Sequence, residues 1–524
     1  MKFKHIYIIG VTMLGLSSCL TSCNDYLDKL PDQRMELKSP SEVSRLLVSA
    51  YPEIHPAYLL EMYSDNADEI VGTGWSEASK FQGQAYRWED ITETSDNESP
   101  QRVWQAGFSA VNTANEALQY INKVSNPEDY KAQKGEALLC RAYAMFSLST
   151  VFCRAYDSTT AAKELGLYYP EEASEEVMAH HERGTLAELY AKIDADLKEG
   201  ISLVGNTYDH PKFHFTQTSA AAFAARFYLY YQKYDEAIKY ANSALGSTPT
   251  LRDWSAWGKL SANGVIQPNA YINSNEKANL LLQVVYSAWG AIGGPTALGN
   301  RYAHGQLISR RETMQSSGPW GVSDDVFNYT VWYNNSIAKY IFRKIPYVFE
   351  YTDIQAGVGY AHSEYSVFNS DLLLLERAEA YALRGDYAKA VADINTELKA
   401  FSNNGVQITL DKIKEFYSDS RLAYSTPQQA TARKQMHTSF ALDMTTQEPL
   451  LQCILHLKRI LTLHEGIRMQ DIKRYGITIY RRTLVNDTEV ESVTDTMTAD
   501  DPRQAVQLPA DVITAGVQAN PRNK

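Results

Sequence analysis

The chain has 524 residues, of which 62 are Asp or Glu and 50 are Lys or Arg, so its formal net charge is −12 at pH 7. An acidic chain is a poor partner for nucleic acid and for the anionic face of a membrane, both of which attract clustered Lys and Arg. Tyrosine is frequent, with 35 residues against 16 Phe, and rings with a polar edge suit both helix interfaces and sugar faces.

The first 28 residues predict a membrane tether. A basic start precedes an apolar run, Ile6 to Leu16, that is too short to span a bilayer and is followed by small residues, as in a secretory signal. The motif Leu20-Thr21-Ser22-Cys23 resembles the lipobox of bacterial lipoproteins. We therefore predict a signal peptide over residues 1–22 and lipidation of Cys23. Cys19 fits the same pattern, but Cys23 is preferred because Asn24-Asp25-Tyr26-Leu27-Asp28 then begins the mature chain.

The remaining sequence offers no other membrane segment. No later stretch has about 18 consecutive apolar residues, which a spanning helix requires, so the mature chain is predicted to form a soluble domain on a lipid anchor. Cys140, Cys153 and Cys453 lack the close spacing of a disulfide framework or a zinc motif. We predict that these three cysteines are buried and pack as small hydrophobic side chains.

The segment before residue 100 combines a short helix with a long loop region. Ser39 and Pro40 supply an N-cap and a first-turn proline, which predicts a helix over residues 39–51. Residues 52–99 have no period and carry aromatic rings among acids, Gly and Ser, as binding loops often do. Three roles stay open for the carboxylates of this segment: hydrogen bonds to sugar hydroxyls, the end of a helix, or a bound cation. These carboxylates are Asp65, Asp68 and Glu69.

From residue 100 onward, apolar residues recur with the 3.6-residue period of helices. Two helices are predicted as far as residue 156, and a third follows Thr185. Residues 217–249 resemble a tetratricopeptide repeat, and three of its positions recur 153 residues later. The matching positions are Ala225, Tyr228 and Ala237, then Ala378, Tyr381 and Ala390. Each such helix pair needs a neighbour to cover its apolar face, so helical repeats are predicted over about 100–249 and 371–475.

The insertion between these repeats, about residues 250–370, is too rich in large rings to be a linker. We expect it to fold onto the repeats, with a strand at residues 279–286. The last strong helix is predicted over residues 450–475, and prolines predict a non-helical tail. On that helix four residues of alternating charge lie three apart, and each can form an ion pair with the next. They are Glu465, Arg468, Asp471 and Arg474.

Several motifs of the chain are similar to those of the SusD/RagB family, outer-membrane lipoproteins of Bacteroidetes. The similarity covers nearly the whole sequence. Its most specific parts are Asp371 to Tyr381 and Glu465 to Gly476. Four further parts of the chain also match: the start at Cys23, Trp104 with Asn112, Asn115 and Leu118, the run Arg141-Ala142-Tyr143, and the tail from Gln507 to Pro521. The family often has Trp where this chain has Met469 and Tyr475.

This resemblance implies a mainly α fold, a single SusD-like domain over residues 23–524 with a tetratricopeptide scaffold, long aromatic loops and a few short strands. It also implies a glycan-binding protein rather than an enzyme, without a cofactor. Such a protein is anchored in the outer membrane, faces the cell exterior and delivers nutrient to a SusC-like TonB-dependent transporter. Because binding loops differ between members, the resemblance does not identify the sugar.

Sugars present a C–H face that packs on exposed indole rings, while their hydroxyls bond to amide and charged side chains. We therefore predict glycan contacts for Trp residues in irregular sequence that contains Gly or Ser, with three polar companions. The predicted ligand-binding residues are Trp75, Trp289, Trp320, Trp332, Asn300, Arg301 and Tyr302.

Two other classes of function make different demands on the sequence. Tetratricopeptide grooves commonly hold peptides, so a peptide-binding or protein-binding surface lipoprotein is the alternative. A glycoside hydrolase needs two carboxylates facing a cleft, and the sequence reveals no such pair. His464-Glu465 lacks the second His of a metalloprotease helix, because Arg468 occupies that position. No catalytic residue and no metal site are predicted.

Overall fold

The computed structural model describes most of the chain after the predicted signal peptide. The described residues are 37–71, 77–174, 181–292, 301–334, 339–486 and 488–522. Cys23, Trp75 and Asn300 lie outside these ranges. Among the residues inside them, no helix has the length and apolarity needed to cross a membrane.

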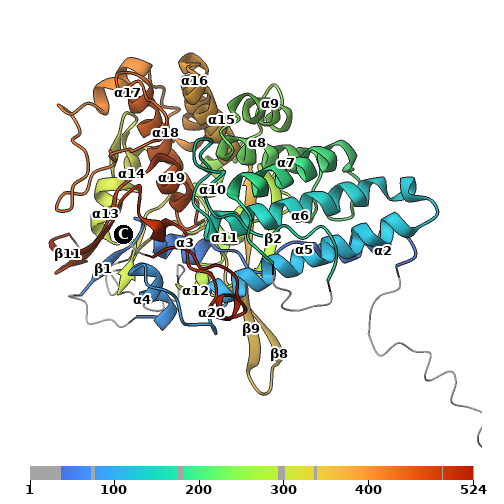
Figure 1. Ribbon diagram of the computed structural model, residues 1–524. Coiled ribbons are helices and arrows are strands. Elements are labelled where there is room, and N and C mark those ends of the chain that lie inside the picture. The colour runs from blue at the N-terminus through green and yellow to red at the C-terminus, as the bar shows by residue number, and fades with distance from the viewer. Residues whose placement is uncertain are drawn as a thin grey trace, which may run out of the picture.

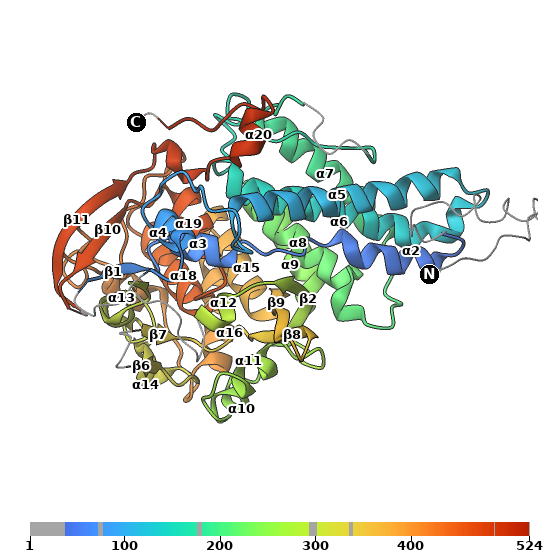
Figure 2. The same cartoon turned by 90° about the horizontal axis from the view of Figure 1, so that it is seen from below.

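A layer of long helices forms one half of the molecule (Figures 1 and 2). The first helix begins at Ser39, whose side chain accepts a hydrogen bond from the Glu42 amide, as predicted from the cap. Thr185 and Glu188 form the capping box that begins α7. The N-terminal helices are α2 (Pro40–Leu47), the short η1 (Val48–Ala50), α5 (Pro100–Lys123), η2 (Pro127–Tyr130), α6 (Lys131–Phe152) and α7 (Leu186–Leu203).

The predicted repeats are present and stack on one another. In each repeat two antiparallel helices are joined by a short turn, and Gly385 adopts a left-handed φ of 83° at the second turn. Helix α9 packs directly on α15 although the insertion separates them in sequence, so the two repeats form one continuous stack. The repeat helices are α8 (Gln217–Tyr230), α9 (Tyr234–Leu245), α15 (Ser370–Arg384) and α16 (Tyr387–Phe401). This arrangement confirms the mainly α fold class.

Close approach of α6 and α7 depends on Gly135. A Cβ atom added there would lie 2.4 Å from the Val204 backbone nitrogen, so Gly135→Ala should force the end of α7 outward. We expect the free energy of unfolding to fall by about 1–3 kcal/mol, because the clash outweighs the helix propensity of Ala. Urea denaturation measures the change. Lys131→Ala, at an exposed position of the same helix, should stay within about 0.5 kcal/mol.

The insertion folds onto the repeats, as expected. Trp254 donates from its indole nitrogen to Oδ1 of Asp371 at 2.8 Å, which ties the start of the insertion to α15. The predicted strand is β2 (Asn279–Tyr286), in a sheet of order β2-β9-β8 with β8 (Val348–Asp353) and β9 (Val358–Asn369). The β8–β9 hairpin projects from the body (Figure 1). Smaller elements are α10 (Trp254–Gly258), α11 (Ile266–Tyr271), α12 (Trp289–Ile292), α13 (Gln306–Glu312), α14 (Ser323–Val326), β4 (Ser317–Gly318), β5 (Gly321–Val322), β6 (Trp332–Asn334) and β7 (Lys339–Ile341).

A four-stranded sheet of order β11-β10-β1-β3 joins distant parts of the chain. In it, Glu69 of β1 lies opposite Tyr302 of β3 on one side and Thr483 of β10 on the other. The region predicted to be irregular, residues 52–99, thus contains a strand and two short helices. These elements are α3 (Ala57–Tyr63), β1 (Asp68–Ile70), α4 (Lys80–Tyr86), β3 (Tyr302–Ala303), β10 (Ile479–Leu484) and β11 (Val490–Met497).

The prediction of one helix over residues 450–475 is wrong. The helix breaks between Leu461 and Arg468, where His464 and Gly466 have positive φ values of 74° and 76°. Position 466 favours Gly because a side chain there would be strained and would meet Ala57. The prediction of a non-helical tail is also wrong, because residues 510–514 form a short helix. The C-terminal helices are α17 (Leu410–Phe416), α18 (Gln447–Leu461), α19 (Arg468–Tyr475) and α20 (Ala510–Thr514).

The predicted charge ladder is only partly formed, because its members pair across the fold. Glu465 lies before α19 and accepts from Lys344 at 2.8 Å. Arg468 makes two hydrogen bonds to Asp65, at 2.8 and 2.9 Å. Asp471 and Arg474 alone pair along the helix, at 3.4 Å. These residues hold segments together, and no member is a free acid.

An ion cluster whose Lys458, Glu379 and Asp471 are buried joins α15, α18 and α19. The ammonium of Lys458 lies 2.7 Å from Asp471 and 3.2 Å from Glu379, and Arg474 lies 2.6 Å from Glu379. Burial alone would raise the pKa of the Glu379 carboxyl, but the charges of Arg474 and Lys458 hold that pKa below its ordinary value. Glu379 is therefore ionised in the folded protein.

The three cysteines are buried and unpaired, as predicted. Burial raises the pKa of the Cys140 and Cys453 thiols, which keeps them in the unreactive thiol form.

Candidate functional site

A cluster of charged and aromatic side chains lies at the β1–β3 edge of the four-stranded sheet. We call Glu69, Glu77, Arg87, Arg301 and Tyr302 the edge cluster. They come from two distant parts of the chain, which the antiparallel pairing of β1 with β3 brings together. Two of the predicted ligand-binding residues, Arg301 and Tyr302, are in it.

Hydrogen bonds fix the geometry of the edge cluster. Arg301 Nε donates to Glu69 Oε1 at 2.8 Å, and Thr483 donates to the other oxygen of that carboxylate at 3.2 Å. Arg87 Nη1 donates to Glu77 Oε1 at 2.8 Å and to the Tyr302 hydroxyl at 2.5 Å. The hydroxyl of Tyr302 donates to the same Glu77 oxygen at 2.9 Å. The charged groups are therefore held in place before any ligand arrives.

The heads of the charged side chains remain accessible. The side chains of Arg87, Glu77 and Arg301 are 37%, 29% and 41% exposed. Tyr302 is buried beneath them and stacks on Tyr86, with ring centroids 4.4 Å apart. Burial is the largest cause that raises the pKa of Tyr302, so its hydroxyl stays protonated and orients Glu77 and Arg87. Tyr302 supports the charged groups from below.

The edge cluster also marks where two undescribed segments join the fold. Glu77 is the first described residue after residues 72–76, which include Trp75, and Arg301 is the first after residues 293–300, which include Asn300. Both first residues belong to the edge cluster. The predicted residues Trp75 and Asn300 themselves lie outside the described residues.

The expectation that Trp289 and Trp320 are exposed is wrong. Trp289 is 3% exposed, stacks on Tyr58 with centroids 4.6 Å apart and donates to the His464 carbonyl at 2.9 Å. Trp320 is 4% exposed and donates to the Ser323 hydroxyl at 3.1 Å. Both rings pack in the core because the irregular segments around them fold back on the helices.

Trp332 is half-buried on β6. The guanidinium of Arg343 lies 4.3 Å from the centroid of its ring, so a cation already covers one ring face. The structure does not bring Trp332 together with the edge cluster through any contact between described residues.

The three carboxylates whose roles the sequence left open have different surroundings in the structure. Asp65 is buried and its two oxygens are bonded to Arg468. Asp68 is buried in β1, where burial raises its pKa to about 6. Glu69 alone reaches the edge cluster. Among the described residues, no group of His, Cys, Asp and Glu is arranged to hold a metal ion.

Two residues of the edge cluster were missed in the sequence. Glu77 and Arg87 stand in ordinary polar surroundings, and Arg87 is 215 residues from its partner Tyr302. No motif or spacing marks such a pairing. The histidines His456 and His464 are buried, and burial lowers the pKa of His456 to about 3.

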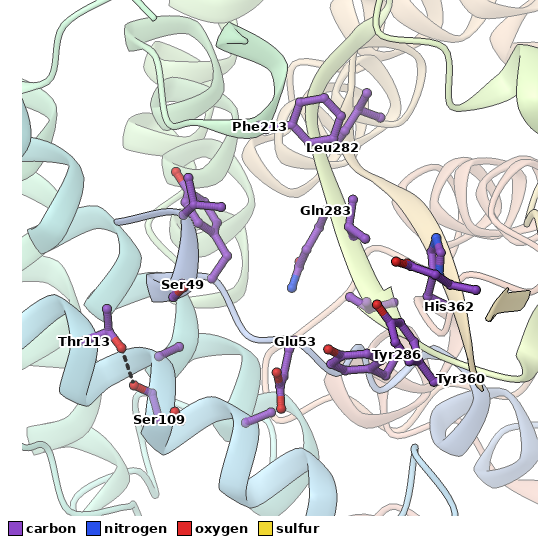
Figure 3. A pocket seen from close by; sticks show the side chains of 17 residues that line it. Ser49, Glu53, Ser109, Thr113, Phe213, Leu282, Gln283, Tyr286, Tyr360 and His362 are labelled. Carbon is purple, nitrogen blue, oxygen red and sulfur yellow. Dashed lines mark hydrogen bonds and ion pairs between the residues drawn. The ribbon is translucent and has the colours of Figure 1, made fainter. Parts of the chain in front are cut away.

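A second candidate region is a cleft of about 350 Å³ between the helical layer and the β2–β9–β8 sheet. We call it the interlayer cleft. Figure 3 shows Ser109 and Thr113 of α5 on one side and Tyr286, Tyr360 and His362 of the sheet on the other. None of its lining residues was predicted, and it shares no residue with the edge cluster.

Comparison with known proteins shows which proteins share this architecture. Residues 25–229 match the sequence model of the SusD-like family described as starch-binding and associating with the outer membrane. No curated protein matches the chain in sequence.

Solved structures share the fold over almost their whole length. A SusD superfamily protein from Bacteroides vulgatus is 15% identical, with a TM-score of 0.65 over 93% of this chain and 100% of that one. A SusD-like carbohydrate binding protein from the same species is 15% identical, with a TM-score of 0.61 over 91% and 97%. A laminarin binding SusD-like protein is 16% identical, with a TM-score of 0.50 over 93% and 100%.

The helical stack with its inserted sheet therefore defines a repeat protein with the SusD fold. Residues 25–229 also match the sequence model of the SusD-like family, so the N-terminal part of the chain is similar to that family in sequence and the chain as a whole shares its fold.

Proposed function

We propose that this protein binds an oligosaccharide at the edge cluster. The single observation that carries the proposal is the set of accessible, prealigned charged groups on Glu77, Arg87 and Arg301. Carboxylates accept hydrogen bonds from sugar hydroxyls and guanidinium groups donate to them. Because the ion pairs hold these groups in place, little side-chain entropy is lost on binding. The family description and the sugar-binding relatives support this ligand class.

In the sequence, Trp75 and Asn300 lie within two residues of Glu77 and Arg301 of the edge cluster. An indole there would give the sugar a face to pack on, while the charged groups bond its hydroxyls. This combination of one apolar face and several fixed polar groups is typical of sites for small polar ligands. The two residues are therefore proposed as the remaining parts of the site.

Direct binding to a printed glycan array tests the proposal. The purified mature chain should bind at least one oligosaccharide, and calorimetry with that oligosaccharide should give a saturable isotherm. A folded protein that binds no glycan, but binds peptides from a displayed library, would support the peptide-binding alternative instead.

The place of this binding is proposed to be the outer membrane, facing the cell exterior, with delivery to a SusC-like TonB-dependent transporter. A tethered receptor beside a transporter presents ligand at high effective concentration, so modest affinity suffices. The lipobox at Cys23 and the family description support the anchor.

Cys23→Ser should release the protein from the outer-membrane fraction of its native host. Loss of the acylated residue removes the binding energy of the acyl chains, about 0.8 kcal/mol per buried methylene. Fractionation followed by immunoblotting measures the change, and co-purification from the wild-type membrane should recover a large barrel protein. Cys19→Ser is the matched control. If Cys19→Ser alone released the protein, Cys19 would be the anchor.

A further inference from the structure

The interlayer cleft is built from elements that the edge cluster does not use. Its walls come from η1 and α5 on one side and from β2, β8 and β9 on the other. Its volume of about 350 Å³ falls within the range of pockets for small ligands. Glu350 of β8 and Tyr360 and His362 of β9 line the cleft, so one of its walls belongs to the hairpin that projects from the body in Figure 1.

Two tyrosines form an aromatic wall in the cleft. The rings of Tyr286 and Tyr360 meet edge to face, with centroids 5.0 Å apart and an interplanar angle of 74°. Both side chains are half-buried. In such a pair one ring face is not covered by the other ring, and a C–H face of a sugar can pack on it.

Polar atoms in the cleft are left for a ligand or water. Nδ1 of His362 is buried and has no hydrogen-bond partner, and it lies 3.8 Å from Glu350 Oε2. Glu53 is exposed at the cleft, and no described residue bonds to its carboxylate. On the opposite wall the Thr113 hydroxyl donates to the Ser109 carbonyl at 3.2 Å and can still accept a hydrogen bond, and Ser109 carries a second hydroxyl one turn earlier on α5. Donors and acceptors thus face each other across the cleft.

The negative charge of the cleft lining disfavours acidic ligands. Its lining includes the carboxylates of Glu53 and Glu350 and no Lys or Arg. A hydrogen bond to Glu350 is the largest cause that raises the pKa of the Tyr360 hydroxyl, which places a carboxylate beside the aromatic wall. An acidic ligand would meet like charge here without a compensating cation, and that repulsion disfavours its binding.

The walls are rigid. The backbone amide of Tyr286 donates to the Glu53 carbonyl at 2.8 Å, and Gln283 accepts from the Tyr143 hydroxyl at 3.0 Å. Helix α5 is held against α6 at Gly107, where an added Cβ would lie 2.6 Å from the Leu148 side chain. The cleft is therefore a formed site and not a gap that closes freely.

From these features we propose that the interlayer cleft is a second saccharide site, which takes neutral or amine-bearing sugar units and excludes uronate and sulfated ones. Its ligand class rests on the proposed function, but its residues are independent of the edge cluster. Two sites on one tethered receptor would let a long glycan bind at both, which raises avidity without new contacts.

A glycan array with neutral, amine-bearing and acidic oligosaccharides tests this proposal. Four proteins are compared: wild type, Tyr286→Ala, Glu53→Gln and the edge-cluster variant Arg87→Ala. At least one neutral or amine-bearing glycan should lose about tenfold or more in affinity with both cleft variants. That glycan should retain measurable binding with Arg87→Ala. Tyr360→Ala, on the exposed part of β9, is the second ring variant if Tyr286→Ala does not fold.

The two proposals fail in different ways. If no glycan signal changes with any cleft variant, the second site is overturned, whatever Arg87→Ala does. If the glycans that depend on the cleft are acidic, the ligand class is overturned. If every signal depends on the cleft and none on Arg87, the edge cluster is not the glycan site.

Discussion

Lys458→Met should lower the free energy of unfolding by about 3–5 kcal/mol. Lys458 is fully buried and its ammonium lies between the carboxylates of Glu379 and Asp471. Methionine fills a similar volume but removes the charge, so two buried carboxylates lose a partner and keep their desolvation cost. Urea denaturation followed by circular dichroism measures the change.

An exposed ion pair provides the control for this prediction. Lys389 lies 3.4 Å from Asp386, and their side chains are 62% and 46% exposed. Lys389→Ala should change the free energy of unfolding by less than about 0.5 kcal/mol, because exposed pairs contribute little. A loss below about 1 kcal/mol for Lys458→Met would mean that the buried carboxylates take up protons or water instead.

Arg87→Ala should weaken, by about 10–100-fold, the binding of an oligosaccharide that the glycan array identifies as a ligand. Arg87 bonds to Glu77, Glu89 and Tyr302, so its removal takes away a donor to sugar and also releases Glu77. Hydrogen bonds to charged groups contribute about 1.5–3 kcal/mol each, which corresponds to this range of affinity. Isothermal titration calorimetry measures the dissociation constant.

Arg421→Ala is the matched control for Arg87→Ala. Arg421 is also a surface arginine paired with a glutamate, 3.6 Å from Glu415, but lies outside the edge cluster. Its replacement should leave the affinity within about twofold. Equal affinity of wild type and Arg87→Ala for every bound glycan would contradict the edge cluster as the binding site.

Local signals in the sequence were enough to predict most of the helical scaffold. The caps at Ser39 and Thr185 and the echoed positions of the two repeats reflect interactions within about 30 residues. The break at His464 was missed although Gly466, a poor helix former, stands two residues later. The apolar period continues past this glycine, and its close approach to Ala57 becomes visible only in the structure.

The candidate sites were much less predictable. Irregular sequence around Trp289 and Trp320 does not reveal whether these segments pack inward, and Trp289 in fact begins the short helix α12. Both rings are in the core. The partners of the edge cluster and the two walls of the interlayer cleft meet only through pairings across hundreds of residues, and such pairings leave no periodic signal in the chain.

The direct packing of α9 on α15 has a consequence for how this protein folds. Residues 246–369 form a long loop in the chain that leaves the stack after α9 and returns to it at α15. Closing a loop of this length costs on the order of 4 kcal/mol of chain entropy before the contact stabilises anything. The α8–α9 and α15–α16 hairpins should therefore form early and separately, and their docking should limit the folding rate.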